Sequence, residues 1–204
     1  MTQIDREKYL DAAELDRLRT VTEAHALTDL KSGRLRGVLA WAVVDVALGT
    51  GLRVSELARL KVGDFDARRR SLRAWRHKRR KPLRETIAVS KALAGHLRQY
   101  IDWKANAGQA TDKDAAIFVG KRGPLTESGL QNIWKAAVRR AGLPVELSIH
   151  SARHTVAVHL LKTTGNLRMV QKQLGHTNPA TTANLYADVS FEDMGEALDG
   201  LYGT

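Results

Sequence analysis

The stretch between residues 34 and 49 constrains the fold most, because it is apolar nearly all round. It reads Arg-Leu-Arg-Gly-Val-Leu-Ala-Trp-Ala-Val-Val-Asp-Val-Ala-Leu-Gly. A helix of this composition has no broad polar face for solvent, so other elements must cover it. Gly49 and Gly51 predict where it ends. We therefore expect a buried central helix in a chain whose 204 residues and 43% hydrophobic content suit one compact domain.

Helical signals dominate the rest of the chain. Leu15, Leu18 and Val21 are spaced by three and predict an amphipathic helix within residues 1–33, beginning at residue 11 or 12. Caps and glycine stops predict further helices over residues 91–107, 126–140, 150–163 and 167–174. Asn178 and Pro179 predict the start of another, and an apolar stripe predicts a final helix over residues 191–201.

Strand signals are confined to short segments. Ser71–Trp75 and Glu85–Val89 predict the two strands of a hairpin, with Lys78–Pro82 as its turn. Ile117–Val119 predicts one more short strand or an extended segment. The predicted fold is therefore mainly α with a small antiparallel β-hairpin sheet (α+β).

The hairpin carries concentrated positive charge. The chain has a formal net charge of +11, and between Arg68 and Arg84 stand ten basic residues and no acidic one. Such a run is often a solvated face, but a tight basic hairpin can also lie along a DNA groove and contact phosphates. The candidate DNA contacts are Arg73, Arg76, Arg79, Arg80 and Lys81.

Several protein classes are disfavoured by composition. No stretch of eighteen apolar residues predicts a membrane span, and the first residues lack the apolar run of a signal peptide. The absence of cysteine excludes a disulfide scaffold and a thiolate zinc site. We expect an intracellular protein whose partner is a polyanion, with nucleic acid the leading candidate and no membrane partner.

Arg53 and Glu56 stand three residues apart in the first turn of a predicted helix that follows Gly51. A cation opposes the helix dipole there, so one interpretation is an exposed arginine tolerated at small cost. The functional interpretation is an anion site, in which the guanidinium and the helix N-terminus face a phosphate. Glu56 could then hold the guanidinium in place.

A second polar group lies on the helix predicted over residues 150–163. His150, Arg153 and His154 share one of its faces. The two histidines have metal-ligand spacing, but the arginine between them would repel a dication, and no His-Glu-x-x-His motif is present. No Gly-x-Ser-x-Gly elbow or Walker loop occurs either, so we expect no metal, ATP or other cofactor.

Attack on a phosphodiester without a metal needs three kinds of group. Two arginines can balance the charge that grows on the non-bridging oxygens. A lysine or histidine can protonate the departing 5′ oxygen, and a nucleophile must attack the phosphorus. Tyr186 lies ten residues after His176 and can supply the nucleophile, although most tyrosines at helical spacing are core or surface residues.

Four motifs together resemble the tyrosine recombinase (phage integrase) family over about residues 10–190. They are Gly51-Leu-Arg-Val-Ser-Glu-Leu, His150-Ser-Ala-Arg-His-Thr, Leu174-Gly-His, and the tyrosine at position 186. The resemblance implies the catalytic residues Arg53, Lys78, His150, Arg153, His176 and Tyr186. It implies Lys78 as the general acid, with Lys81 as the alternative. Glu56 and His154 match supporting positions beside the two arginines.

The resemblance also implies the fold of DNA breaking-rejoining enzymes. Residues 1–204 are expected to form a single catalytic domain without the N-terminal core-binding domain of many relatives. Residues 190–204 either fold back on their own domain or pass to a neighbouring protomer. The expected partners are double-stranded DNA at a specific site and further copies of the chain, as a tetramer on DNA and a monomer when free.

The implied function is site-specific DNA recombination through a 3′-phosphotyrosyl intermediate, in the prokaryotic cytoplasm. Two alternatives stay open. One is a DNA-binding regulator of the same fold without catalysis. The other is relaxation of DNA like that of type IB topoisomerases, in which the same chemistry reseals the original strand.

Overall fold

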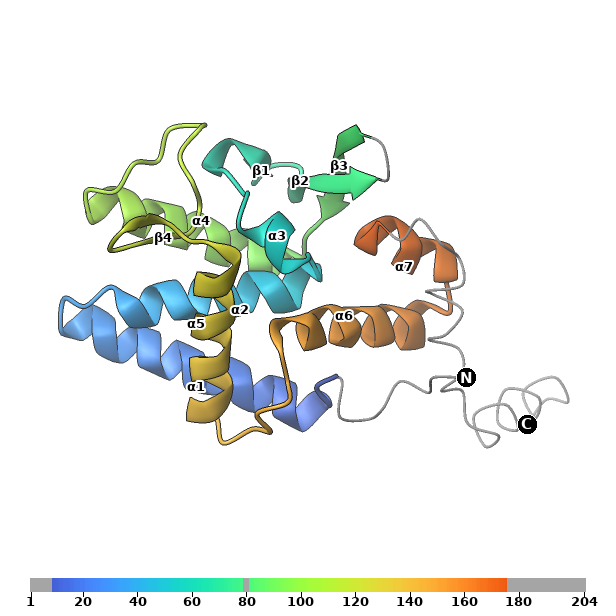
Figure 1. Ribbon diagram of the computed structural model, residues 1–204, viewed down its shortest axis with the longest axis horizontal. Coiled ribbons are helices and arrows are strands. Elements are labelled where there is room, and N and C mark those ends of the chain that lie inside the picture. Colours follow the sequence, from blue (N-terminus) through green and yellow to red (C-terminus); the bar gives the residue numbers. More distant parts are fainter. Residues whose placement is uncertain (1–8, 79–80, 176–204) are drawn as a thin grey trace, which may run out of the picture.

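The computed structural model describes residues 9–78 and 81–175, and seven α-helices are found in these ranges (Figure 1). The helices are α1 (Ala12–Lys31), α2 (Arg36–Thr50), α3 (Val54–Leu57), α4 (Lys91–Asn106), α5 (Glu127–Arg140), α6 (Ile149–Thr164) and α7 (Leu167–Leu174). The strands are β1 (Phe65–Asp66), β2 (Ser71–Lys78), β3 (Lys81–Ala88), β4 (Val119–Gly120) and β5 (Gly123–Pro124). A short 3-10 helix, Val62–Asp64, precedes β1. The predicted mainly helical fold with a small antiparallel sheet is confirmed.

Helix α2 is the centre of the molecule, as its composition predicts. Helices α1, α4, α5 and α6 all pack against it, and Figure 1 shows them around it. Val43, Ala47 and Leu48 are among its buried side chains. The helix continues through Gly49 and ends at Gly51, which adopts the left-handed conformation at φ 66°.

The predicted helix ends agree with the capping side chains. The carboxylate of Asp11 accepts the backbone N–H of Glu14 at the start of α1, and the hydroxyl of Thr126 accepts that of Gly129 at the start of α5. Ser148 caps α6, and Gly165 ends it in the left-handed conformation. These local signals fix where α6 begins, and so where its polar residues lie.

Strands β1, β2 and β3 form one antiparallel sheet. The β2–β3 ladder runs from the pair Ser71 and Ala88 to the pair Lys78 and Lys81. The predicted turn over Lys78–Pro82 is therefore wrong, because the pairing continues through the basic residues and leaves two residues, 79 and 80, between the strands. Pairing can continue there because the backbone of charged residues pairs as well as any other.

The segment over Ile117–Val119, predicted as a short strand or an extended segment, is only partly a strand. Only Val119 belongs to a strand, in the small sheet of β4 and β5, while Ile117 and Phe118 are core residues. Lys104 on α4 holds this segment, because its ammonium group donates to the carbonyls of Ala116 and Ile117 at 2.6 and 2.9 Å. The apolar run thus reports burial rather than sheet pairing.

Candidate active site

Arg53 lies at the N-cap of α3, directly after the left-handed turn at Gly51. Its guanidinium Nη1 donates to Glu56 Oε1 at 2.9 Å, and its backbone N–H donates to Glu56 Oε2 at 2.9 Å. The Glu56 side chain is 2% exposed, whereas that of Arg53 is 42% exposed. Glu56 therefore holds Arg53 as the sequence predicts, and leaves one side of the guanidinium open to an incoming anion.

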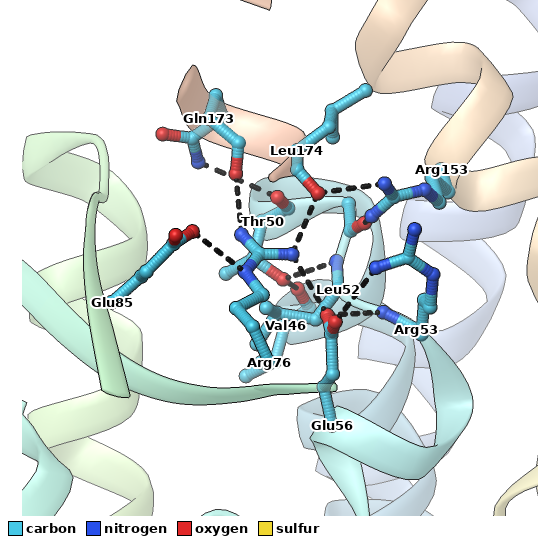
Figure 2. A network of polar contacts seen from close by, with 11 residues as sticks. Val46, Thr50, Leu52, Arg53, Glu56, Arg76, Glu85, Arg153, Gln173 and Leu174 are labelled. Atoms are coloured by element: carbon cyan, nitrogen blue, oxygen red, sulfur yellow. Dashed lines mark hydrogen bonds and ion pairs between the residues drawn. The ribbon is translucent and has the colours of Figure 1, made fainter. Parts of the chain in front are cut away.

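Arg153 comes from α6 and lies beside this turn (Figure 2). It is buried, and its Nη1 and Nη2 donate to the carbonyls of Gly51 and Leu174 at 2.8 and 2.7 Å. Burial, and then the charge of Arg53, lowers the pKa of Arg153 to about 9. The side chain is still a cation at neutral pH, in a place where an anion would be stabilised.

The two histidines beside Arg153 differ from it in exposure. His150 lies in the first turn of α6 and is exposed, while His154 is half-buried one turn further on. All three residues are on α6, so the predicted helical spacing is confirmed. In the part of the chain that the structure describes, no group of three His, Asp or Glu side chains could hold a metal ion.

Arg76 is buried in the same network, and its predicted role as a DNA contact is wrong. Its side chain is 2% exposed, on the inner face of β2. Nη1 donates to Glu56 Oε2 at 3.0 Å and to the Leu174 carbonyl at 2.7 Å. Nη2 donates to the Gln173 carbonyl at 2.7 Å. The alternation of β2 turns Arg76 to the side of Leu72 and Ala74, away from solvent.

The end of α7 is where these contacts meet. The Leu174 carbonyl accepts from both Arg76 and Arg153, as Figure 2 shows. Cations are favoured at this place, since the last carbonyls of a helix carry partial negative charge and lack helical partners. Gln173 adds a second tie, because its amide pairs with both the N–H and the carbonyl of Ala88 on β3.

A family comparison identifies the arrangement. The "Phage integrase family" matches residues 8–193. The chain belongs to this family.

Named members of the integrase family are similar in sequence. Tyrosine recombinase XerC of Actinobacillus pleuropneumoniae serotype 7 is 32% identical over 198 residues, which are 96% of this chain and 59% of that protein. Tyrosine recombinase XerC of Corynebacterium efficiens is 36% identical over 158 residues, 77% of this chain and 48% of that protein. The chain thus spans about half to three fifths of the length of these relatives.

Solved structures agree on the integrase-family fold. The crystal structure of XerA recombinase matches with a TM-score of 0.74 at 25% identity, covering 96% of this chain and 65% of that one. The Tn1549 transposon integrase, in complex with transposon right end DNA, matches with a TM-score of 0.73 at 20% identity, covering 98% and 67%. These likenesses confirm the predicted fold class.

The structure brings together only some of the residues predicted for an integrase-family site. Arg53, Glu56 and Arg153 meet in one network, with His150 and His154 on the same helix as Arg153. Arg73 is exposed on β2, where it donates to the Gly63 carbonyl, and its contact with DNA stays a prediction. His176, Tyr186, Arg79 and Arg80, together with the side chains of Lys78 and Lys81, lie outside the described part.

Sequence reasoning missed Gln173 and the buried place of Arg76. No local signal marks Gln173, because the backbone partners of its side chain, on Ala88 and Thr50, lie 85 and 123 residues away. A signal did exist for Arg76, since strict alternation along β2 puts it on the face of two apolar residues.

None of the helices in the described ranges is long and apolar enough to cross a membrane.

Proposed function

We propose that this chain is one catalytic domain of a site-specific recombinase that cuts and rejoins double-stranded DNA through Tyr186. The observation that carries the proposal is the convergence of Arg53 and Arg153. The two come from helices 100 residues apart in sequence, yet their charges act on each other beside the same buried carboxylate. Two guanidinium groups in this arrangement suit a single phosphate between them.

The reaction follows from the charges that develop at the phosphate. Tyr186 Oη gives its proton to one of the site's imidazoles, attacks phosphorus and forms a 3′-phosphotyrosyl bond as the bond to the 5′ oxygen breaks. Arg53 and Arg153, with His150 and His176, stabilise the negative charge on the non-bridging oxygens. Lys78, with Lys81 as the alternative, gives its proton to the leaving 5′ oxygen. A different 5′ hydroxyl then attacks the phosphotyrosine and releases the phenol, so no external energy source is consumed.

The relatives support this reading of the site. Several are named tyrosine recombinases, and solved structures with the same fold hold their DNA substrates. We propose assembly as a tetramer on DNA. We propose that the reaction takes place in the prokaryotic cytoplasm, at the nucleoid DNA.

The test is covalent trapping on nicked DNA. A pool of duplexes with randomised sequence and a nick near the scissile position loses a short fragment after cleavage, so the protein stays attached to the 3′ end. At low salt, where phosphate contacts are strongest, we expect an adduct with the wild type and none with Tyr186→Phe. Sequencing the trapped strands then gives the site preference.

Two results would contradict the proposal. An absence of adduct with the whole pool, while the DNA is still bound, would favour a regulator without catalysis. Adducts that only reseal their own strand, even when a foreign 5′ hydroxyl end is supplied in excess, would favour the relaxing activity. Strand transfer to the foreign end supports recombination.

A further inference from the structure

Arg76 has a structural role that the basic residues around it in the sequence do not indicate. It stands within the basic run of the hairpin, yet its side chain is 2% exposed. Every described hydrogen bond from its guanidinium goes to protein, to Glu56 and to the carbonyls of Gln173 and Leu174. Glu85 lies 3.6 Å from its Nε as a second acidic neighbour. The Arg76 guanidinium is therefore bound within the protein, and no part of it is accessible to a phosphate.

The partners of Arg76 show which element depends on it. The hairpin is held by its own ladder, which runs from Ser71 and Ala88 to Lys78 and Lys81. Helix α7 has only eight residues and a small apolar contact with α6, through Val170 and Leu174. Its end is otherwise fastened by side chains, so the loss of Arg76 should release α7 rather than the hairpin.

Gly175 shows how closely the guanidinium approaches the residue that follows α7. A Cβ at Gly175 would lie 2.8 Å from Arg76 Nε and 2.9 Å from its Cζ. The backbone there also has φ 66°, which disfavours any side chain. The guanidinium thus lies against the peptide that leads directly to His176. A methyl group at Gly175 would push on the same contact from the opposite side.

We propose that Arg76 is a positioning residue for the proposed reaction, which fixes the end of α7 beside Arg153, where the chain continues toward His176 and Tyr186. This inference rests on the proposed recombinase reaction. Arg76 contacts no DNA, and it acts on the nucleophile's segment rather than on the lysine of the hairpin. It joins β2, the carboxylate behind Arg53 and the chain that carries the nucleophile.

Removal of Arg76 leaves the phosphate site largely in place. Arg53 keeps Glu56 through Oε1 and through its own backbone N–H. Arg153 keeps the carbonyl of Gly51, which does not belong to α7. Binding of DNA should therefore persist while the attacking group loses its place, which separates the rate of cleavage from affinity.

The experiment compares Arg76→Met with wild type in single-turnover cleavage of a nicked substrate, alongside DNA affinity and thermal unfolding. Methionine keeps the length and apolar body of the side chain without its donors. We expect cleavage to fall by about 100-fold, the loss typical of a displaced reacting group. We expect affinity to change by less than about threefold, because a buried Arg76 neutralises no phosphate.

A substrate with sulfur in place of the bridging 5′ oxygen identifies the group that is displaced. A thiolate leaves without a proton, so loss of the general acid is rescued by sulfur, while loss of the nucleophile's position is not. Lys78→Ala is the matched control, or Lys81→Ala if that lysine is the acid, and its cleavage should recover. Arg76→Met should stay slow on the same substrate.

Two further variants guard against a simple folding defect. Arg76→Lys keeps a buried charge beside Glu56 but loses the fork, and should be slowed by about tenfold. Gly175→Ala displaces the same contact without changing any residue of the hairpin, and should reproduce the unrescued slow cleavage. If Arg76→Met is unfolded in thermal scans, these two variants carry the same comparison.

Each contrary outcome has its own meaning. Rescue of the Arg76 variants by sulfur would show that Arg76 supports the hairpin lysine, and would overturn the inference. A fall in affinity with a shallower salt dependence would show a DNA contact, and unchanged cleavage would show no role in positioning. If the wild type itself forms no adduct, the proposed function fails instead.

Discussion

Lys104 and Arg76 are two of the buried cations in the described ranges that hold carbonyls of other segments, and they differ in what surrounds them. Lys104 is 0% exposed and donates to the carbonyls of Ala116 and Ile117, in the segment before β4. Arg76 is 2% exposed and donates to the carbonyls of Gln173 and Leu174, at the end of α7. Arg76 also meets Glu56 at 3.0 Å. Among the ion pairs of the described ranges, none involves Lys104.

The difference distinguishes a buried cation that stabilises the core, Lys104, from one that supports the candidate site, Arg76. A point-like ammonium can satisfy two neighbouring carbonyls in the core, and nothing else is asked of it. The planar fork of Arg76 joins three elements and shares its carboxylate with Arg53, one of the two arginines of the proposed phosphate site. Loss of Lys104 should therefore lower stability, whereas loss of a site cation should lower catalysis.

The largest expected effect is on cleavage, from Arg153→Ala. This side chain is the third buried cation, and its removal takes one of two phosphate donors, so cleavage should fall by about 1000-fold. The free energy of unfolding should change little, by about 1 kcal/mol or less, because the substitution relieves the repulsion of Arg153 by Arg53 and Arg76. The Leu174 carbonyl also keeps Arg76 as its donor.

The measurement is adduct formation on nicked DNA, together with urea unfolding. Arg98→Ala, an exposed arginine on α4, is the matched control and should leave both unchanged. A large drop in the urea midpoint of Arg153→Ala would show that the site cations stabilise the fold as Lys104 does. The proposed difference between Lys104 and the site cations would then be wrong.

The second prediction is the converse effect, from Lys104→Met. Methionine fills a similar volume but leaves the carbonyls of Ala116 and Ile117 without a donor, so unfolding should cost about 2 to 4 kcal/mol less. The cleavage rate of the folded fraction should equal that of wild type. Lys135→Met, at an exposed position on α5, is the control and should be neutral in both measurements.

The same contrast decides what the sequence could predict. The buried course of α2, the cap at Thr126 and the stop at Gly165 are local signals, and the structure confirms each of them. The contact between Glu56 and Arg53 is also local, three residues along one helix turn. Such features depend on nearest neighbours in the chain, which a sequence displays directly.

The contacts of Lys104 and Arg76 could not be predicted in the same way. Lys104 meets carbonyls 12 and 13 residues away, and Arg76 meets carbonyls 97 and 98 residues away. Only the tertiary fold brings these partners together. For Arg76 the dense positive charge of its neighbours outweighed the alternation of β2, which was the one signal that pointed inward.

The smallest expected effect is a dependence of stability on pH, and it belongs to Lys104. Burial lowers the pKa of Lys104 below its ordinary value. The unfolded chain therefore binds this proton more tightly than the folded one, so between the lowered pKa and about 10.4 stability rises with pH. Below the lowered pKa the lysine is charged in both states, and its contribution is constant. The neutral amine still has two hydrogens for its two carbonyls, which is why the folded protein tolerates its loss of charge.

The difference between wild type and Lys104→Met isolates this contribution from Arg153, which both proteins keep. Urea unfolding at several values between pH 7 and pH 10 should show the gap between the two proteins widening toward alkaline pH, by about 1 kcal/mol or less. A gap that narrows instead would mean that the folded state holds Lys104 as a cation through a partner acid. Lys104 would then resemble Arg76 in having an acidic partner, and the two buried cations would differ only in where they lie in the fold.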